Sequence, residues 1–257
     1  MTLPFPFIVS RVPVPVASDA LAWWRKGELQ YQNTSATLPA TLSGEGIRRW
    51  DDFINGYSLQ NASTNVPLIH SDNESASFTR GGGGVPDFIS GEVFAPLLSG
   101  NQPFSVITRL TTHSSLALTY AWFTLKLQGS PAASFASHVL RLNNASAWSV
   151  ARRGDSLVNK TYPGGSVGGV VASVSTTYTH THIFDGTVGN DYIAGSQIYT
   201  DVDISGSATF DRVIMGASDL LNSSGSSGFE GIIHHIVVFD HAINPATQSY
   251  WEAQVAA

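Results

Sequence analysis

Beyond residue 20, apolar and polar positions alternate along the chain in short runs separated by turn-forming residues. In the segment 103–110, PFSVITRL, Phe104, Val106 and Leu110 fall in phase, and the segment 116–128, LALTYAWFTLKLQ, has the same period of two. Because successive side chains of a β-strand point to opposite faces, this period predicts strands. Similar runs follow, namely HVLRLNN, AWSVARR, THTHIFDG, NDYIAGSQIYTDVDI and DRVIMGAS. Many short strands without a long helical period predict an all-β antiparallel sandwich or barrel.

One segment, at the C-terminal end, has the pattern of a helix. In NPATQSYWEAQVAA, Asn244 is suited to the N-cap position and Pro245 to the first helical position. The pairs Tyr250–Trp251 and Gln254–Val255 then recur at helical spacing. We therefore expect a short C-terminal helix that closes one end of the sandwich.

The first eighteen residues differ from the rest because proline alternates with apolar residues there, at positions 4, 6, 13 and 15. Proline fixes φ and removes a hydrogen-bond donor, which favours an extended path. We expect an arm over 1–18 and a sandwich over 19–257. The arm's apolar side chains need a partner surface, either on the same sandwich or on a neighbouring subunit. The predicted partner-binding residues are Phe5, Phe7, Ile8, Val12, Val14 and Val16.

Composition narrows the possible functions. Charged residues make up 12% of the chain, the net charge is −6, and no basic run is present, so nucleic acid is not an expected partner. Cysteine is absent, which removes disulfides, thiolate nucleophiles and sulfur-ligated metals. No apolar run approaches the roughly 20 residues of a membrane span. The prolines also interrupt any secretory signal, so we expect a soluble protein made in the cytoplasm.

Two adjacent histidines, His234 and His235, lie in a run that predicts a strand from Gly231 to Phe239. Strict alternation would place Ile233, His235, Val237 and Phe239 on one face and Ile232, His234, Ile236 and Val238 on the other. The two imidazoles would then point apart and could not share a metal ion. We expect both histidines to be hydrogen-bonded strand residues.

A second histidine pair, His180 and His182, is spaced so that both side chains share one face of a strand. Two imidazoles on one face could reach one cation, with Asp185 as the nearest further ligand. Two ligands do not make a metal site, and we favour a solvent-facing strand of threonine and histidine instead.

In the C-terminal half, a strand with a DG turn and a hairpin precedes DRVIMGAS, and the segment FEGIIHHIVVFDHAIN then has the form F-x-G-x-I. This order resembles the closing half of laminin-G-like domains of the concanavalin A-like lectin/glucanase superfamily. LAWWRKG, RRWDDFINGYSLQNAS, SASFTRG and NQPFSVITRL are similar to the opening strands, so the resemblance covers about residues 20 to 257. It implies a two-sheet antiparallel jelly-roll sandwich. The residues that hold the pattern are Phe229, Gly231, Ile233, Ile236, Val238, Phe239, Ala242, Ile243 and Asn244.

The resemblance also permits a test for enzymatic activity. Glucanases of this superfamily carry a Glu-x-Asp-x-Glu triplet, because retaining glycoside chemistry needs two carboxyl groups about 5 Å apart. This chain has no such triplet, and its nearest string offers only Asp201 and Asp203, which we expect on an exposed strand edge. No G-x-S-x-G motif marks a serine nucleophile. We therefore predict a protein that is not an enzyme.

Members of this superfamily often hold calcium at a loop rim, where aspartates and backbone carbonyls supply the ligands. Asp72, Asp185 and Asp191 are conceivable ligands here, and the sequence does not choose among them. We predict no cofactor, and a rim calcium stays open.

Three functions fit these observations. We favour a structural protein of a bacteriophage virion, folded in the host cytoplasm, whose arm docks on other virion proteins or on copies of itself. The alternative is a carbohydrate-binding module, which the virion protein could also be if it adheres to surface polysaccharide. A polysaccharide-cleaving enzyme ranks third. Aromatic residues that could stack on sugars are Trp122, Trp148, Tyr178 and Tyr192, although each is favoured as a core residue.

Overall fold

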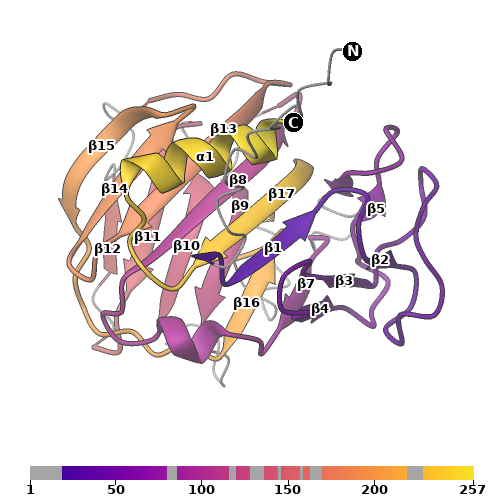
Figure 1. The fold of residues 1–257 in the computed structure, drawn as a ribbon, viewed down its shortest axis with the longest axis horizontal. Coiled ribbons are helices and arrows are strands. Elements are labelled where there is room, and N and C mark those ends of the chain that lie inside the picture. The colour runs from indigo at the N-terminus through magenta and orange to yellow at the C-terminus, as the bar shows by residue number, and fades with distance from the viewer. Residues whose placement is uncertain are drawn as a thin grey trace, which may run out of the picture.

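The computed structural model describes residues 19–79, 86–115, 120–127, 136–143, 146–156, 159–162, 170–218 and 228–257. These residues form a sandwich of two antiparallel β-sheets with one α-helix, α1 (Pro245–Ala256), so the predicted fold class is confirmed (Figure 1). The predicted arm, with all six of its partner-binding residues, lies outside the described part. The boundary at residue 18 and the role of the arm therefore stay predictions.

The first sheet has eight strands, and β17 (Gly231–Phe239) lies at its centre. One edge of β17 pairs with β8 (Phe104–Thr112), while β6 (Ala76–Phe78) and β1 (Ala22–Arg25) share the other edge. The sheet continues beyond β8 through β13 (Thr177–Phe184), β14 (Val188–Ile193) and β15 (Ser196–Asp203), and beyond β6 through β5 (Leu68–Ile69).

The second sheet has nine strands. Their order is β12 (Asn159–Tyr162), β11 (Trp148–Arg153), β10 (Ser137–Leu142), β9 (Tyr120–Lys126), β16 (Arg212–Met215), β7 (Ile89–Gly91), β4 (Ser58–Gln60), β3 (Arg49–Asp51) and β2 (Gln30–Tyr31). A short 3-10 helix, η2 (Ala95–Leu98), follows β7. None of the described helices is long and apolar enough to cross a membrane.

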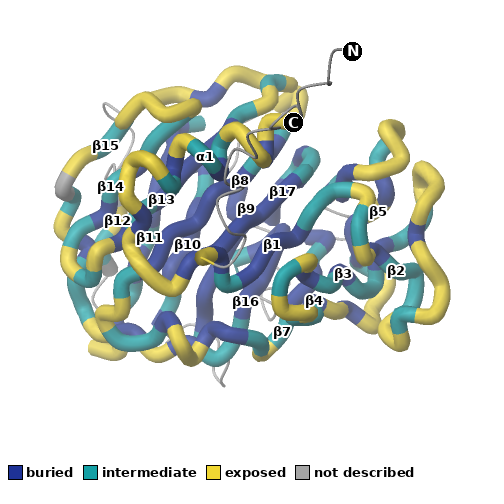
Figure 2. The backbone as a smooth tube through the Cα atoms, in the orientation of Figure 1, coloured by how far each residue is buried: buried dark blue, intermediate teal, exposed yellow. Residues whose placement is uncertain are grey.

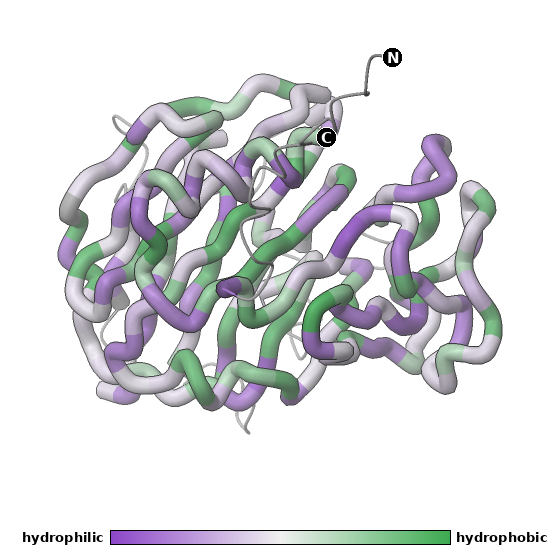
Figure 3. Tube along the Cα trace, viewed as in Figure 1, coloured by the Kyte–Doolittle hydropathy of each residue, from purple (hydrophilic) through white to green (hydrophobic). Residues whose placement is uncertain are grey.

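The main core lies between the two sheets. Phe104, Val106 and Leu110, which the period of two placed on one face, are all fully buried in it. The backbone is buried along the central strands and exposed in the connecting loops (Figure 2). Apolar and polar stretches alternate along the same trace (Figure 3). The alternation in sequence thus becomes an inner and an outer face for each strand.

The helix forms as its sequence predicts, but it packs elsewhere. The side chain of Asn244 accepts a hydrogen bond from Thr247 N at 2.9 Å, and Pro245 is the first helical residue. Trp251 and Val255 pack in a second apolar cluster on the outer face of the eight-stranded sheet. The helix therefore covers part of that outer face, beside β8 and β13, and does not close an end of the sandwich (Figure 1). The physical reason is an apolar outer stripe, including Phe239, that needs cover.

Candidate functional site

A β-bulge in β17 places both adjacent histidines on the outer face of the eight-stranded sheet. Ile233 pairs with Leu110 and His235 pairs with Arg109, the next residue of β8 in register, so His234 is the extra residue. A bulge opposes two residues to one and shifts the phase of the strand. The prediction of strict alternation from Ile233 to His235 is therefore wrong.

The bulge also changes the partners of the apolar residues in β17. Ile233, Ile236 and Val238 belong to the core between the sheets, whereas Val237 and Phe239 belong to the outer cluster under α1. The strand is still covered on both sides, as its continuous apolar run predicted. What the sequence did not reveal is that two imidazoles now lie side by side on a partly open face.

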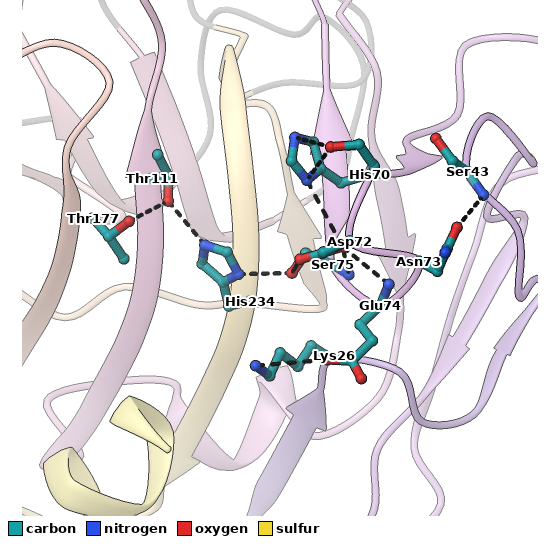
Figure 4. A network of polar contacts seen from close by, with 11 residues as sticks. Lys26, Ser43, His70, Asp72, Asn73, Glu74, Ser75, Thr111, Thr177 and His234 are labelled. Atoms are coloured by element: carbon teal, nitrogen blue, oxygen red, sulfur yellow. Dashed lines mark hydrogen bonds and ion pairs between the residues drawn. The ribbon is translucent and has the colours of Figure 1, made fainter.

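His234 lies in a chain of hydrogen bonds that crosses three strands (Figure 4). Ser75 Oγ lies 2.5 Å from Asp72 Oδ2 and 2.7 Å from His234 Nδ1. On the other side, Thr111 Oγ1 lies 2.9 Å from His234 Nε2 and 2.7 Å from Thr177 Oγ1. The expectation that His234 is hydrogen-bonded is confirmed.

The number of protons on each group fixes the direction of each hydrogen bond in this network. Ser75 has one hydroxyl proton and donates it to the Asp72 carboxylate, so the serine oxygen must accept from His234 Nδ1–H. The neutral imidazole then accepts from Thr111 at Nε2. Burial lowers the pKa of His234 to about 4, against the opposing effect of Asp72, so the imidazole is neutral at pH 7.

This arrangement is not a nucleophilic triad. In a triad the histidine lies between the acid and the serine and takes the serine proton. Here the serine lies between the acid and the histidine, its proton is directed at Asp72, and Ser75 is fully buried. The network fixes the position of His234 and offers no activated hydroxyl.

His235 differs from His234 because its Nδ1 atom has no hydrogen-bond partner among the described residues. Its ring instead lies beside Trp23, with ring centroids 6.1 Å apart. Burial and the nearby Lys26 lower its pKa to about 3. The expectation that His235 is a hydrogen-bonded strand residue is therefore wrong for Nδ1.

A cavity of about 700 Å³ opens beside these histidines, between the turn after β1, β17 and the last turns of α1. Alternation along β1 sends Trp24 into the main core and Trp23 and Arg25 outward. Trp23 meets Trp251 of α1 edge to face, with ring centroids 5.2 Å apart. We call this the larger cavity, lined by Trp23, Arg25, Lys26, Gly27, Glu28, Glu74, His235, Tyr250, Trp251, Gln254 and Ala257.

One wall of the larger cavity is a tight turn that favours glycine. Gly27 has φ +69°, and its N–H donates to Glu74 O at 2.9 Å. A Cβ at this position would approach Glu74 Cγ to 3.3 Å, in a backbone conformation that other residues rarely adopt. The turn carries Lys26, whose Nζ lies 3.6 Å from Glu74 Oε2 (Figure 4).

A smaller cavity of about 220 Å³ adjoins the larger one, and the two share Lys26 and His235. Its other polar side chains are Arg109, Thr177 and His234. Two cations and two neutral imidazoles thus line it, and none of its lining residues is acidic. The two cavities together, which we call the α1 groove, are our candidate functional site.

The other histidine pair, His180 and His182, does share one face, but that face points into the core. Both are buried, and both lie within hydrogen-bond distance of Asp191 Oδ1, at 2.8 and 3.2 Å. The prediction that this strand faces solvent is therefore wrong. The acidic partner of the two histidines is Asp191, not Asp185 as the sequence suggested. The hairpin between β13 and β14 pairs His182 with Asp191 directly.

This buried cluster extends across the sandwich to the second sheet. His138 Nε2 lies 3.0 Å from His182 Nε2, and Arg152 Nη1 lies 3.2 Å from His138 Nδ1. Because Arg152 can only donate, His138 must carry its proton on Nε2 and donate it to His182, whose Nδ1–H then donates to Asp191. Burial lowers the pKa of His138 well below its usual value, and burial of Asp191 is outweighed by His182 and His180, which lower its pKa.

The predicted carboxylates have separate roles. The side chain of Asp185 accepts hydrogen bonds from the backbone N–H groups of Thr187 and Val188. Asp203 lies on β15, at the edge of the sheet as expected, and its carboxylate binds Lys160 Nζ at 2.8 Å. The side chain of Asp201 lies outside the described part. Across the described ranges, no group of three or more His, Asp or Glu side chains is placed to hold a metal ion.

The aromatic residues considered as sugar platforms are mostly interior. Trp122 and Trp148 are fully buried in the main core, and Tyr178 packs against it. Tyr192, on β14, is half-buried. A partly exposed candidate is instead Tyr250 of the α1 groove, which sequence reasoning did not single out. The signal was present in WWRKG, where outward-pointing aromatic and basic residues precede a glycine turn, and in Arg109, the one charged residue of β8.

No protein-family model and no curated protein matches this chain. Among solved structures, a Trypanosoma rangeli sialidase in complex with 2,3-difluorosialic acid superposes with a TM-score of 0.58 at 11% identity, over 92% of this chain and 33% of that one. The same enzyme in complex with sialic acid gives 0.55 at 13% identity, over 88% and 36%. A CBM40 domain of a Ruminococcus gnavus sialidase bound to α2,3-sialyllactose gives 0.46 at 14% identity, over 60% and 83%.

The sialidase likeness concerns the fold. The chain spans about a third of the length of the sialidase chains it matches. At these identities the superposition shows a common sandwich architecture and transfers no activity.

Proposed function

We propose that this chain is a non-enzymatic carbohydrate-binding domain and that it binds a glycan in the α1 groove. The observation that carries the proposal is the composition of the larger cavity. Aromatic rings of Trp23 and Tyr250 lie there beside the polar groups of Arg25, Glu28 and Gln254, within about 700 Å³. That volume falls in the usual range for small-molecule sites.

The pairing of rings with planar polar groups suits a sugar. A pyranose ring has an apolar C–H face that packs on an aromatic ring and a rim of hydroxyl groups that need both donors and acceptors. Tyr250 is half-exposed at the groove, while Trp23 is held by Trp251 behind it. Arg25 packs over the Trp23 ring, 5.1 Å from its centroid, so its guanidinium is held at the cavity wall.

Absence of catalysis is part of the proposal. Retaining and inverting glycosidases need two free carboxyl groups on opposite sides of the bond that breaks. The acidic residues that line the larger cavity, Glu28 and Glu74, both lie at the Gly27 turn, on one wall and not on opposite sides. None of the described residues that line the groove is a serine or a cysteine, and the hydroxyl of nearby Ser75 is directed at Asp72.

One neighbour of similar fold supports a glycan as the ligand by analogy. The Trypanosoma rangeli enzyme was solved with sialic acid bound, so a sandwich of this kind occurs in a protein that handles sugars. The finer assignments, a laminin-G-like domain and a bacteriophage virion protein, stay predictions from the sequence. They depend in part on the arm over 1–18, outside the described residues.

The test is a glycan array followed by isothermal titration of any glycan it reveals. Tyr250→Ala removes an exposed ring from the groove, and we expect at least a tenfold loss of affinity, in line with the loss of a stacking contact. Tyr31→Ala is the matched control, because Tyr31 is also half-buried but lies on β2 in the other sheet. Equal affinity in wild type and Tyr250→Ala, or no binding to any glycan, would contradict the proposal.

A further inference from the structure

We infer that the smaller cavity of the α1 groove binds the anionic group of an acidic glycan, a carboxylate or a sulfate ester. The inference rests on the proposed function, because it names the class of glycan that the groove takes. It requires Lys26 and Arg109 to face the ligand, and the sugar ring to occupy the larger cavity.

Charge is distributed unevenly between the two cavities. The larger one balances Arg25 and Lys26 against Glu28 and Glu74, whereas the smaller one has Lys26 and Arg109 and no acidic lining residue. The whole chain has a net charge of −6, so a purely cationic lining does not follow from its composition. A local excess of positive charge on an acidic protein is a feature that an anionic ligand would compensate.

Arg109 is the stronger of the two anion ligands. It lies on the outer face of β8, opposite His235 in register, and its Nη1 donates to Thr179 Oγ1 at 3.0 Å. Among the described residues it has no carboxylate partner, and that hydrogen bond leaves the donors at Nε and Nη2 without a protein acceptor. A guanidinium edge binds carboxylate or sulfate through two parallel hydrogen bonds.

Lys26 is available because its partner is weak. Its Nζ atom lies 3.6 Å from Glu74 Oε2, and the Glu74 side chain is 54% exposed (Figure 4). Exposed ion pairs of this kind contribute little to stability and are screened by salt. A ligand anion in the smaller cavity can therefore compete for the ammonium group.

The lowered pKa values of His234 and His235 reflect the positive charge around the smaller cavity. Burial lowers the pKa of His234 to about 4 and that of His235 to about 3, and in both cases Lys26 and Arg109 lower it further. Both imidazoles are neutral at pH 7, and His234 is already occupied at both nitrogens. The charge available to an anion at pH 7 thus comes from Lys26 and Arg109.

The last turn of α1 also borders the smaller cavity, through Val255 and Ala256. Free carbonyls at a helix C-terminus attract cations, so Lys26 and Arg109 could serve the helix instead of a ligand. Within the described residues, however, neither side chain makes a hydrogen bond to a carbonyl of α1; their polar contacts are Glu74 and Thr179. The two cations are therefore not committed to the helix.

The sizes of the cavities fit one ligand that spans both. About 220 Å³ accommodates an anionic substituent but is below the usual size of a site for a whole ligand. Because Lys26 and His235 line both cavities, a sugar packed on Tyr250 can extend its acidic group toward Arg109. An acidic sugar thus meets a ring at one end and a guanidinium at the other.

The experiment is an array that carries sialylated, uronate-containing and sulfated glycans beside the neutral glycan of each, followed by titration of the best pair. We expect the acidic member to bind at least tenfold more tightly than its neutral counterpart at pH 7. The sialyl and uronate arms report a carboxylate ligand, and the sulfated arm reports a sulfate ester. Arg109→Gln should remove most of this preference, and Lys26→Gln part of it.

The matched control is Arg212→Gln, which removes the same charge from β16, where Arg212 binds Glu92 outside the groove. Melting temperature and circular dichroism establish that each variant is folded. Binding of neutral glycans alone, or an acidic preference that survives in Arg109→Gln, would overturn the inference and leave the proposed function standing. Absence of binding to every glycan would overturn both.

Discussion

Asp191→Asn removes the negative end of the buried cluster that joins the two sheets, and its cost can be worked from the contacts. Asp191 Oδ1 accepts from His180 Nε2 at 2.8 Å and from His182 Nδ1 at 3.2 Å, and the residue is 1% exposed. At the far end of the same chain, buried Arg152 donates to His138. The substitution is nearly isosteric, so it changes charge and hydrogen bonding but not packing.

Two hydrogen bonds set the magnitude. Each hydrogen bond to a charged acceptor is worth about 1.5 to 3 kcal/mol, and an asparagine oxygen retains part of it. Asp191 accepts two such bonds, from His180 and His182, whereas Arg152 has Asp155 as a negative neighbour and is not left uncompensated. We therefore expect Asp191→Asn to lower the free energy of unfolding by about 3 to 5 kcal/mol.

The assay is urea unfolding followed by tryptophan fluorescence. Trp148 is a local probe, because its ring stacks on His180 with centroids 5.0 Å apart and planes 9° apart. Asp203→Asn is the control: that carboxylate binds Lys160 on the exposed edge strand, and its loss should leave the urea midpoint nearly unchanged. If Asp191→Asn unfolds within about 1 kcal/mol of wild type, the buried cluster does not couple the sheets as argued.

Two further predictions concern the stability of the folded protein. Acid should destabilise the protein for two reasons. The histidine partners of Asp191 lower its pKa, so this carboxylate contributes stability above its unfolded pKa of about 3.9, and that stability is lost as the pH falls below this value. Burial lowers the pKa of His138, so below about pH 6.5 this imidazole binds a proton only when the protein unfolds. The free energy of unfolding should thus fall below about pH 6.5 because of His138 and fall further below about pH 4 because of Asp191, and a flat profile would contradict this assignment. Asn244→Ala removes the N-cap of α1 and should cost about 1 kcal/mol in urea unfolding, with an unchanged midpoint as the contrary result.

The sequence predicted the sandwich well because its signal is local. A period of two in β8 and a cap followed by proline at Asn244 are read from neighbouring residues, and both elements form as expected. The packing of α1 on the outer face was not predicted, because it depends on an apolar stripe assembled from three segments distant in sequence.

The candidate site and the buried cluster were harder to predict, because each depends on a feature that alternation does not encode. A single extra residue in β17 brings His234 and His235 to one face, and nothing in GIIHHIVVF marks the bulge. The buried cluster likewise joins His138 and Arg152 of one sheet to Asp191 of the other, which only the packing of the sheets brings together.

The central claim is that a glycan binds in the α1 groove, and nitrogen-15 NMR of the six tryptophan indoles tests it most directly. On addition of the tightest glycan from the array, we predict that the indole signals of Trp23 and Trp251 shift, since both line the groove. Those of Trp122 and Trp148, buried in the main core, should stay in place. Shifts confined to other tryptophans, or no shift at a saturating concentration, would contradict the account.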